Sequence, residues 1–304
     1  MSRPVICVRG LRKTYGSVEA VRGIDLEVDA GEVFAFLGPN GAGKTTTVEI
    51  LEGYRGPTDG EVEVLGENPA EGTAAWRARI GVVLQGGEVE PLLTVRELLE
   101  LYAGYYPAPR SIDETIAQVG LDEQRDRRAG KLSGGQQRRL HVALALIGDP
   151  ELLFLDEPTT GFDPAARRGA WDVIAGLRTL GKTVFLTTHY IEEAEVLADR
   201  VAIIKDGKIV AEGTPKELAA GRTHTLIRFS LPTGVPAAEL PGGLGHRVRA
   251  NGERLELASD TPVQDLAELC NWAIDRGVDL RDLDAVRPSL EDVYLELTTA
   301  RAHT

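Results

Sequence analysis

The chain has 304 residues, and its 47 acidic against 34 basic side chains give a formal net charge of −13 and a pI near 5.0. This acidic balance argues against a protein that binds nucleic acid through a basic surface. The length allows about two domains of roughly 150 residues each.

No stretch of the sequence approaches the ~18 consecutive apolar residues that a membrane span needs. The first six residues also lack the apolar core of a secretory signal. We therefore expect a soluble, cytoplasmic chain that reaches a membrane only through a partner. Cys7 and Cys270 lie far apart among apolar neighbours. They predict two buried free thiols rather than a disulfide or a metal site.

The first phosphate-binding pattern follows a short strand expected at 6–8 and an alternating, half-exposed antiparallel strand expected at 24–28. The apolar run 33–37 predicts a buried strand, and G-x-x-x-x-G-K-T comes directly after it, before a helix expected to include Val48. Glycines let backbone N–H groups turn inward around an anion, and a helix N-terminus favours phosphate. The loop residues are Gly38, Pro39, Asn40, Gly41, Ala42, Gly43, Lys44, Thr45 and Thr46.

Two side chains of this loop suit a nucleotide. Lys44 supplies a mobile positive charge for the outer phosphates, and the Thr45 hydroxyl is a natural ligand of Mg²⁺. A glycine-rich turn that binds no phosphate is the alternative, which the flanking strand and helix disfavour.

A helical insertion is expected after the next two strands. The second of these strands ends at Gln85, and no convincing strand follows before Leu132. Apolar residues recur with helical spacing in this interval. The expected strands are 61–66 and 80–84, and the expected helices are 94–106 and 112–119.

A second anion-binding helix start is expected at Ser133, a good N-cap residue. Gly134 and Gly135 open this helix and leave its first N–H groups bare, and Gln136 follows them. An ordinary capped helix with a flexible lead-in is the alternative.

Polar residues follow two apolar strands farther along the chain. The continuous apolar run 152–155 predicts a central parallel strand, and it ends in Asp156 and Glu157. A loop containing Asp163 precedes a helix expected at 165–180, and His189 follows a further buried strand at 183–187. Open α/β sheets bind ligands at the carboxyl edge of their strands. We therefore expect both carboxylates and the histidine to lie together at a site.

The remaining sequence predicts a hairpin around Asp206-Gly207, a short helix and then a small α+β domain from about residue 222. No catalytic constellation is visible after about residue 200. We expect domains at 1–221 and 222–304. In the second, the expected elements are a strand at 224–231, a loop at 232–245, a hairpin around Asn251-Gly252, a helix at 263–276 and a last helix beginning at 288–292, with Leu290, Val293, Tyr294 and Leu297 on its core face.

The ordered set of motifs resembles the ATP-binding subunits of ABC transporters over roughly residues 5–218. The resemblance implies an α/β fold: a P-loop NTPase core with an antiparallel β subdomain, and a helical subdomain at about 86–150. The matching residues are Gly38–Thr46 for Walker A, Gln85 for the Q-loop, Leu132–Gln136 for the signature, Asp156 and Glu157 for Walker B, Asp163 for the D-loop and His189 for the switch histidine.

The resemblance also implies a role for each matching residue. Lys44 and the rest of the Walker A loop bind ATP, and Tyr15 stacks on adenine. Thr45, Gln85 and Asp156 hold Mg²⁺, the last through water. Catalysis falls to Glu157, which orients the attacking water, and to His189, Lys44 and Asp163. Ser133, Gly134, Gly135 and Gln136 meet the nucleotide of a second copy, so that two chains close head to tail around two ATP molecules.

The carboxyl-terminal part resembles drug and antibiotic exporters of the daunorubicin-resistance type, through Pro288-Ser289-Leu290-Glu291-Asp292. Phe162 stands where the family has leucine, and Gly86-Gly87 after Gln85 is another departure. The resemblance implies a peripheral ATPase at the cytoplasmic face of the cell membrane, with integral-membrane permease subunits encoded separately. One alternative is a soluble non-transport ABC ATPase in translation or DNA repair. Another is a nucleotide-binding regulator without turnover, against which Glu157 and His189 argue.

Overall fold

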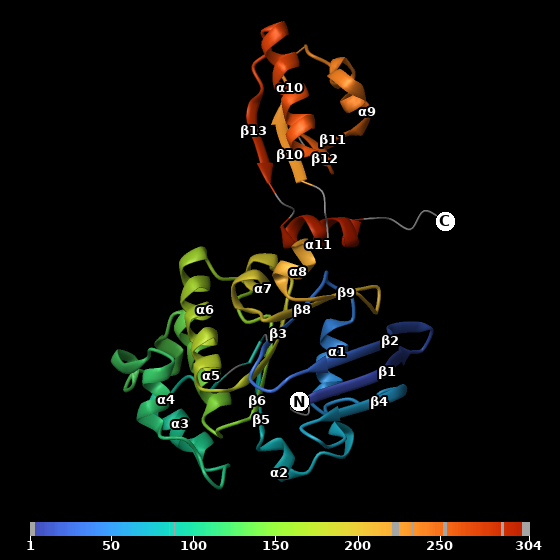
Figure 1. The fold of residues 1–304 in the computed structure, drawn as a ribbon. Coiled ribbons are helices and arrows are strands. Elements are labelled where there is room, and N and C mark those ends of the chain that lie inside the picture. Colours follow the sequence, from blue (N-terminus) through green and yellow to red (C-terminus); the bar gives the residue numbers. More distant parts are fainter. Residues whose placement is uncertain are drawn as a thin grey trace. The chain divides into compact units, whose positions relative to one another are not determined.

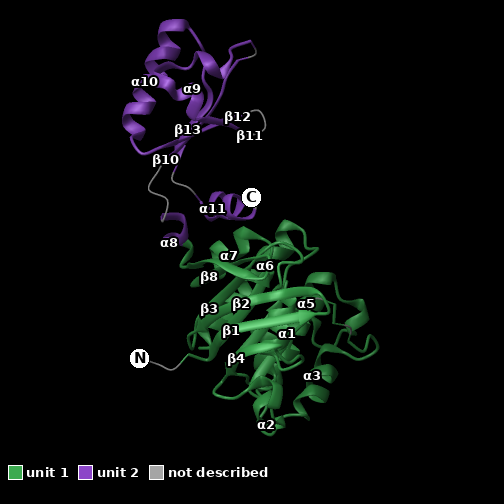
Figure 2. Ribbon diagram, turned by 90° about the vertical axis from the view of Figure 1, so that its right-hand side faces the viewer, with its two compact units in different colours: residues 1–215, 301–304 green, residues 216–300 purple. Residues whose placement is uncertain are grey.

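The computed structural model describes residues 4–84, 86–87, 89–220, 225–232, 234–251, 254–286 and 289–299. The chain divides after Pro215 into two compact units, coloured green and purple in Figure 2. We call the part up to Pro215 unit 1 and the part from Lys216 unit 2. The domain limit predicted between residues 221 and 222 lies outside the described residues and stays a prediction.

Unit 1 is built around a six-stranded sheet with the order β5-β6-β7-β3-β8-β9. Its first five strands run parallel, and β9 runs antiparallel to β8. The central strands are buried along their length, which is why continuous apolar runs predicted them correctly. The strands are β3 (Val33–Leu37), β5 (Ile80–Val83), β6 (Leu152–Asp156), β7 (Thr183–Thr188), β8 (Arg200–Lys205) and β9 (Lys208–Gly213).

Helices lie on both sides of this sheet (Figure 1). On one side α6 contacts α5, α7 and β7, whereas α1 lies between the sheet and strands β2 and β4. α1 begins at Lys44, directly at the end of the phosphate-loop pattern. The helices of unit 1 are α1 (Lys44–Leu51), α2 (Ala74–Arg77), α3 (Val95–Ala103), α4 (Ile112–Gln118), α5 (Gly134–Leu146), α6 (Pro164–Thr179) and α7 (Ile191–Leu197).

A second sheet of unit 1 has the antiparallel order β2-β1-β4, with β1 (Ile6–Tyr15), β2 (Val18–Val28) and β4 (Asp59–Val64). β1 is longer than the predicted strand at 6–8 because its polar second half pairs through the backbone, past a bulge at Gly10. Its apolar residues share one core with α1 and the aromatic side chains of the large sheet. This core fixes the antiparallel sheet beside the phosphate loop.

The predicted helical insertion is confirmed. The described residues between 86 and 132 form α3, α4, short 3₁₀ turns and an isolated β-bridge from Thr94 to Arg128. Thr94 caps α3 through a capping box with Glu97. Helix α2 was not predicted, because its four residues are too few to show a period.

Unit 2 contains a four-stranded antiparallel sheet with the order β11-β12-β10-β13. The predicted hairpin and long helix are confirmed, although Gly252 of the turn, His224 and Pro288 lie outside the described residues. The expected loop at 232–245 contains two 3₁₀ turns and the start of α9, and β13 was not predicted. The elements are α8 (Pro215–Ala220), β10 (Thr225–Ser230), α9 (Leu244–Arg247), β11 (Val248–Asn251), β12 (Arg254–Ser259), α10 (Pro262–Arg276), β13 (Arg281–Val286) and α11 (Leu290–Thr299).

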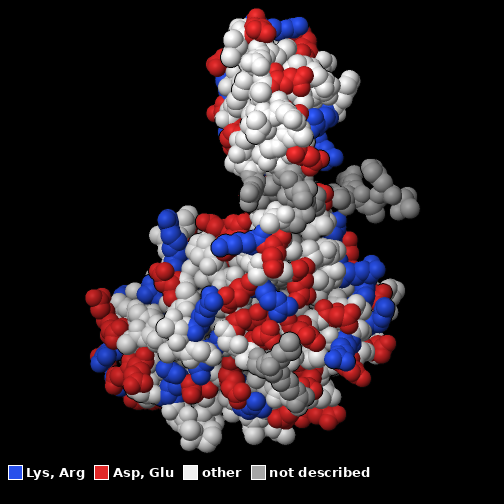
Figure 3. Space-filling model, viewed as in Figure 1, with Lys and Arg blue, Asp and Glu red and all other residues white. Residues whose placement is uncertain are grey.

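Cys7 and Cys270 are free, as predicted, but each is only partly buried, so the expectation of buried thiols is wrong. Cys7 alternates with buried Ile6 and Val8, and therefore points to the other face of its sheet. On the face shown in Figure 3, acidic and basic side chains are interspersed over unit 1. Among the described residues, no helix is both long enough and apolar enough to cross a lipid bilayer.

Candidate functional site

The phosphate loop connects β3 to α1 and holds Lys44 in a buried position, 5% exposed. The Lys44 ammonium donates hydrogen bonds to the carbonyl oxygens of Gly38, at 2.7 Å, and of Pro39, at 3.2 Å. Gly43 caps the helix at φ 107°, and a Cβ there would lie 2.6 Å from the Ala20 carbonyl oxygen. Only glycine fits this position without strain. The backbone is therefore closely packed where α1 begins.

A cavity of about 370 Å³ opens at this loop. It combines a lysine, threonine hydroxyls and the N–H groups at the start of α1, which together suit a chain of phosphates. Hydroxyl and carboxylate oxygens are also the ligands that Mg²⁺ takes in proteins, so the residues present fit a magnesium nucleotide. The lining residues are Ala20, Asn40, Gly41, Gly43, Lys44, Thr45, Thr46 and Glu157.

Two neighbouring carboxylates enter the site from the end of β6. The Thr187 hydroxyl at the end of β7 donates to Asp156 Oδ1 at 2.5 Å and accepts the backbone N–H of Glu157 at 3.0 Å. Glu157 has a φ of 44°, in the left-handed region that a residue other than glycine rarely adopts. The turn directs the Glu157 carboxylate back toward the phosphate loop.

The Glu157 carboxylate lies close to two other predicted site residues, Lys44 and His189. Its Oε1 lies 3.7 Å from Lys44 Nζ and 3.3 Å from His189 Nδ1. Its Oε2 accepts a hydrogen bond from the Thr160 hydroxyl at 3.0 Å. Burial lowers the pKa of Lys44, and the carboxylates of Glu157 and Asp156 act in the opposite direction. Lysine, carboxylate and histidine thus converge at the carboxyl edge of the sheet.

Other predicted residues do not line this cavity. Asp163 caps α6 by accepting the N–H groups of Ala165 and Ala166. Ser133 and Gln136 form a reciprocal capping box that opens α5, with Gly134 and Gly135 in its first turn. Tyr15, at the end of β1, is 40% exposed, with Lys13 and Arg55 near its ring. Gln85 lies outside the described residues.

The sequence interpretation missed two residues that shape the site, Arg138 and Thr187. Arg138 is buried on α5 and donates to the carbonyl oxygens of Leu84, Asp156 and Pro158 at 2.6, 2.8 and 3.0 Å. Burial lowers its pKa, and nearby Asp156 opposes that shift. Arg138 thereby ties the ends of β5 and β6 to the turn at Glu157. No local motif marks it, but a threonine at the end of an apolar strand, beside the expected site, could have singled out Thr187.

Two family models match the chain. The model described as "ABC transporter" matches residues 21–160, which include the phosphate loop, the start of α5 and both carboxylates. The model described as "ABC transporter domain-containing protein-like, C-terminal domain" matches residues 225–289 in unit 2.

Relatives match over nearly the whole length. The chain is 38% identical to a Nod factor export ATP-binding protein I of Rhizobium johnstonii, over 98% of this chain and 96% of that protein. It is also 38% identical to the daunorubicin/doxorubicin resistance ATP-binding protein of Streptomyces peucetius, over 95% and 91% of the two chains. A solved dimeric ATP-binding cassette with ADP and Pi matches at a TM-score of 0.61 and 28% identity, covering 69% of this chain and 98% of that one.

These matches agree with the geometry. The phosphate loop, the start of α5, the carboxylates at the end of β6 and the histidine after β7 occur in the order expected for this family, on the expected elements. The full-length relatives extend the agreement through unit 2. The chain therefore belongs to the ATP-binding proteins of ABC transporters, which are ATPases.

Proposed function

We propose that this chain is the ATP-hydrolysing subunit of an exporter whose permease consists of separate integral-membrane polypeptides. The observation that carries the proposal is the convergence of Lys44, Glu157 and His189 at the phosphate loop. The names of the full-length relatives, which refer to Nod factor export and to drug resistance, support the direction of transport. The substrate would be a drug-like or other small molecule, and the chain would work at the cytoplasmic face of the membrane.

Hydrolysis at this site would be a matter of positioning and charge. Lys44 and the N-terminus of α1 hold the β- and γ-phosphates. Glu157 orients and polarises the water that attacks the γ-phosphorus, while the bond to the β-phosphate oxygen breaks. His189 holds the γ-phosphate side of the reacting group. When bound, Mg²⁺ would neutralise phosphate charge, and Thr45, Asp156 and Gln85 would hold it.

The start of α5 is assigned to a second copy of the chain. Ser133 and its neighbours offer a helix N-terminus suited to phosphate, but they do not line the cavity of their own phosphate loop. Two chains arranged head to tail would place each α5 start on the nucleotide of the other. The dimeric solved relative with ADP and Pi supports this arrangement.

A groove elsewhere in unit 1 is assigned to the permease. It encloses about 670 Å³ and contains exposed apolar side chains, among them Tyr54 at 80% and Leu84 at 56% exposure. Glu52 Oε1 and His141 Nε2 are buried there without a hydrogen-bond partner among the described residues. A partner helix could cover the exposed apolar side chains with its own apolar residues and give Glu52 and His141 hydrogen-bond partners with its polar ones.

The test is a tagged pull-down from detergent-extracted membranes, with retained proteins identified by mass spectrometry. Recovery of a multi-span protein in stoichiometric amount supports the transporter assignment and identifies the permease. Recovery of ribosomes or DNA instead would overturn it in favour of a soluble ATPase of translation or repair, an alternative that the relatives do not favour.

A further inference from the structure

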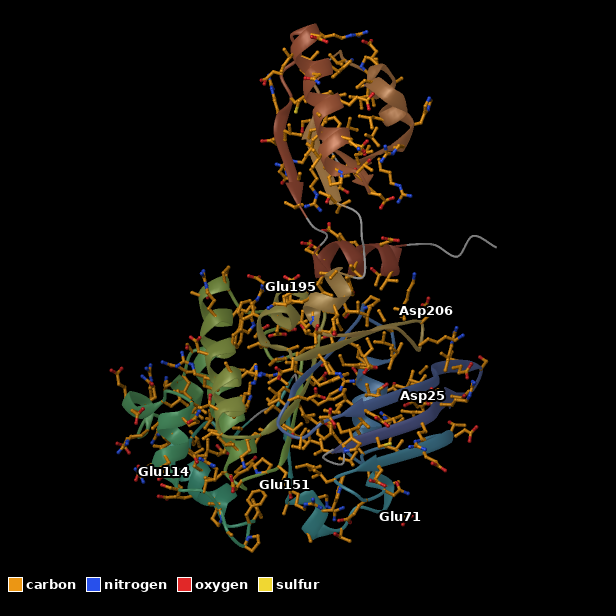
Figure 4. The ribbon with its side chains drawn as sticks, viewed as in Figure 1. Asp25, Glu71, Glu114, Glu151, Glu195 and Asp206 are labelled. Atoms are coloured by element: carbon orange, nitrogen blue, oxygen red, sulfur yellow. The ribbon has the colours of Figure 1, made fainter. Side chains whose placement is uncertain are left out.

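Helix α7 carries a carboxylate that is withdrawn from water. Glu193 has no exposed surface, whereas Glu192 and Glu195 on the same helix are exposed, and Figure 4 labels Glu195 on α7. A buried carboxylate is retained only where hydrogen bonds offset its lost hydration. The contacts of Glu193 therefore show what its burial achieves.

Glu193 Oε1 accepts two hydrogen bonds from other segments. The Thr159 hydroxyl, in the loop after β6, donates at 2.8 Å, and Trp171 Nε1, on α6, donates at 3.1 Å. Burial raises the pKa of Glu193, and the hydrogen bonds from Thr159 and Trp171 oppose this shift. One buried oxygen thus joins α6, α7 and the loop that begins with Glu157.

This junction lies next to a strained turn. Glu157 keeps its left-handed φ of 44° only if its surroundings hold it there. On the amino-terminal side, Thr187 binds the Glu157 N–H. On the carboxyl-terminal side, Arg138 Nε donates to the Pro158 carbonyl oxygen at 3.0 Å, and Thr159 is anchored to Glu193. Both Thr159 and Glu193 are fully buried, so no solvent competes for their bond.

Tyr190, the N-cap residue of α7, links the histidine of the site to α6. The Tyr190 ring lies 4.1 Å from the His189 ring, and the Arg167 guanidinium on α6 lies 4.1 Å from the Tyr190 ring. Glu193 lies four residues after His189, in the first turn of α7. A shift of α7 relative to the Glu157 turn would therefore change the separation of Glu157 and His189, which is now 3.3 Å.

We propose that Glu193 is a positioning residue for ATP hydrolysis, which holds the Glu157 turn in register with His189 through Thr159. The proposal rests on the role assigned to Glu157 above. Glu193 does not touch the nucleotide in this account. It acts through the backbone of the loop between Glu157 and Thr159.

The test compares kcat and KM for ATP among variants of the full chain. Thr159→Val removes one hydroxyl with little change of shape, and Glu193→Ala removes the acceptor. We expect Thr159→Val, which breaks one hydrogen bond to Glu193, to lower kcat about tenfold. Glu193→Ala also loses the bond from Trp171 and should lower kcat at least as much. KM should stay within about twofold in both variants. Glu193→Gln keeps an acceptor oxygen and should recover most of the loss.

Two matched controls separate positioning from general destabilisation. Thr183→Val removes a buried hydroxyl at the opposite end of β7, which accepts the Gly31 N–H. Glu195→Ala removes an exposed carboxylate of α7. Both should keep kcat near wild type. The double variant Thr159→Val/Glu193→Ala should be no slower than Glu193→Ala, because Glu193→Ala already removes the bond that Thr159→Val breaks.

The outcomes also distinguish this inference from the proposed function. If Glu157→Gln abolishes turnover while Thr159→Val matches Thr183→Val, the positioning role of Glu193 is wrong and the site stands. If Glu157→Gln itself turns over normally, the proposed function fails first. A rise in KM with kcat unchanged would also overturn the inference, since it would place Glu193 in nucleotide binding. Thr159→Val remains decisive even if Glu193→Ala does not fold.

Discussion

Glu157 occupies a backbone conformation that packing alone would not select, at the point where a carboxylate meets Lys44 and His189. Strain of this kind costs about 1–3 kcal/mol and concentrates at sites where geometry matters more than stability. Thr187 supports both halves of the arrangement, because its single hydroxyl binds Asp156 and the Glu157 N–H. A strained residue held by several hydrogen bonds is what we expect at the reaction site that we propose.

We predict that Glu157→Gln keeps ATP binding and lowers turnover about 100-fold or more, the usual range for loss of a general base. The amide preserves the shape but cannot polarise water. The variant should therefore accumulate as an ATP-bound dimer, measured by phosphate release and size-exclusion chromatography. Glu114→Gln on the exposed surface of α4 is the control. Near-normal phosphate release from Glu157→Gln would refute the assigned role.

The carboxyl group of Glu52, in the apolar groove, should make the stability of the protein depend on pH. Burial, with Asp156 and Glu49 adding like charge, raises the pKa of Glu52 to about 8 from 4.5. The folded protein therefore keeps a proton that the unfolded chain loses, and its stability falls as pH rises from 4.5 to about 8.

Glu52→Gln keeps the neutral form and removes this loss. We expect its melting temperature to exceed that of the wild type by about 10 °C at pH 8, because the raised pKa corresponds to roughly 4 kcal/mol there, at about 2–4 °C per kcal/mol, and by much less at pH 5. Thermal melts at both pH values measure this, with Glu114→Gln as the exposed control. An equal shift at both values would contradict the assignment.

The sequence was sufficient to predict that charged side chains lie together beside the phosphate loop. Spacing alone placed Lys44, the carboxylates and His189 at one edge, and the structure brings Lys44, Glu157 and His189 within 3.7 Å of a neighbour. The supporting residues were not predictable in the same way. Arg138 and Glu193 act from helices through long-range contacts that no local pattern contains.

We assign two roles to the first turn of helix α5. The Ser133 hydroxyl accepts the Gln136 N–H and the Gln136 side chain accepts the Ser133 N–H, so the helix start is stabilised within one chain. The same start is assigned to the nucleotide of a second chain. A substitution that keeps the cap but changes its charge separates these two roles.

Ser133→Asp is that substitution, because aspartate is as good an N-cap as serine. We expect the melting temperature to change by less than about 2 °C, since an acid at a helix N-terminus is favourable. Turnover should fall about tenfold or more, because like charges at 4 Å repel by about 4 kcal/mol near a protein surface. Ser111→Asp, at the N-cap of α4, is the control and should leave turnover unchanged. Full activity in Ser133→Asp would refute the contact with phosphate.

Helices and strands were predicted correctly where burial gives the sequence a periodic pattern of apolar residues. They were missed where no such pattern exists. Buried strands β3, β6 and β7 and the amphipathic helices α3, α6 and α10 were correct to within a few residues. β13 was missed because all but the last of its residues are exposed. That strand exists because its backbone pairs with β10, a long-range partner that no local window contains.

At the scale of the whole molecule, unit 2 has its own core of buried apolar residues, built around Ile227, Phe229, Leu257 and Leu269. Because this core is separate, we expect unit 1 to keep its phosphate loop, both carboxylates and His189 when unit 2 is removed. The described residues that line the cavity at the phosphate loop all belong to unit 1. We propose that it contacts the partner or supports the dimer.

We predict that a chain truncated after residue 221 still binds ATP, with a dissociation constant within about threefold of the full chain, and recovers less permease from membranes. Nucleotide titration and quantitative pull-down measure the two effects. Arg228→Ala in the full chain, which breaks ion pairs to Glu256 and Asp292, tests whether the fold of unit 2 is needed. Unchanged dimerisation and unchanged membrane association of the truncated chain would refute a role for unit 2 in assembly.

The two partly exposed cysteines are suitable labelling sites for following the motion of unit 2 relative to unit 1. Cys7 lies on β1 in unit 1, Cys270 lies on α10 in unit 2, and the sequence contains no other cysteine. A donor and an acceptor fluorophore could therefore be attached to the native chain without engineering new thiols. Energy transfer between them would report, in real time, whether ATP binding and hydrolysis move one unit against the other.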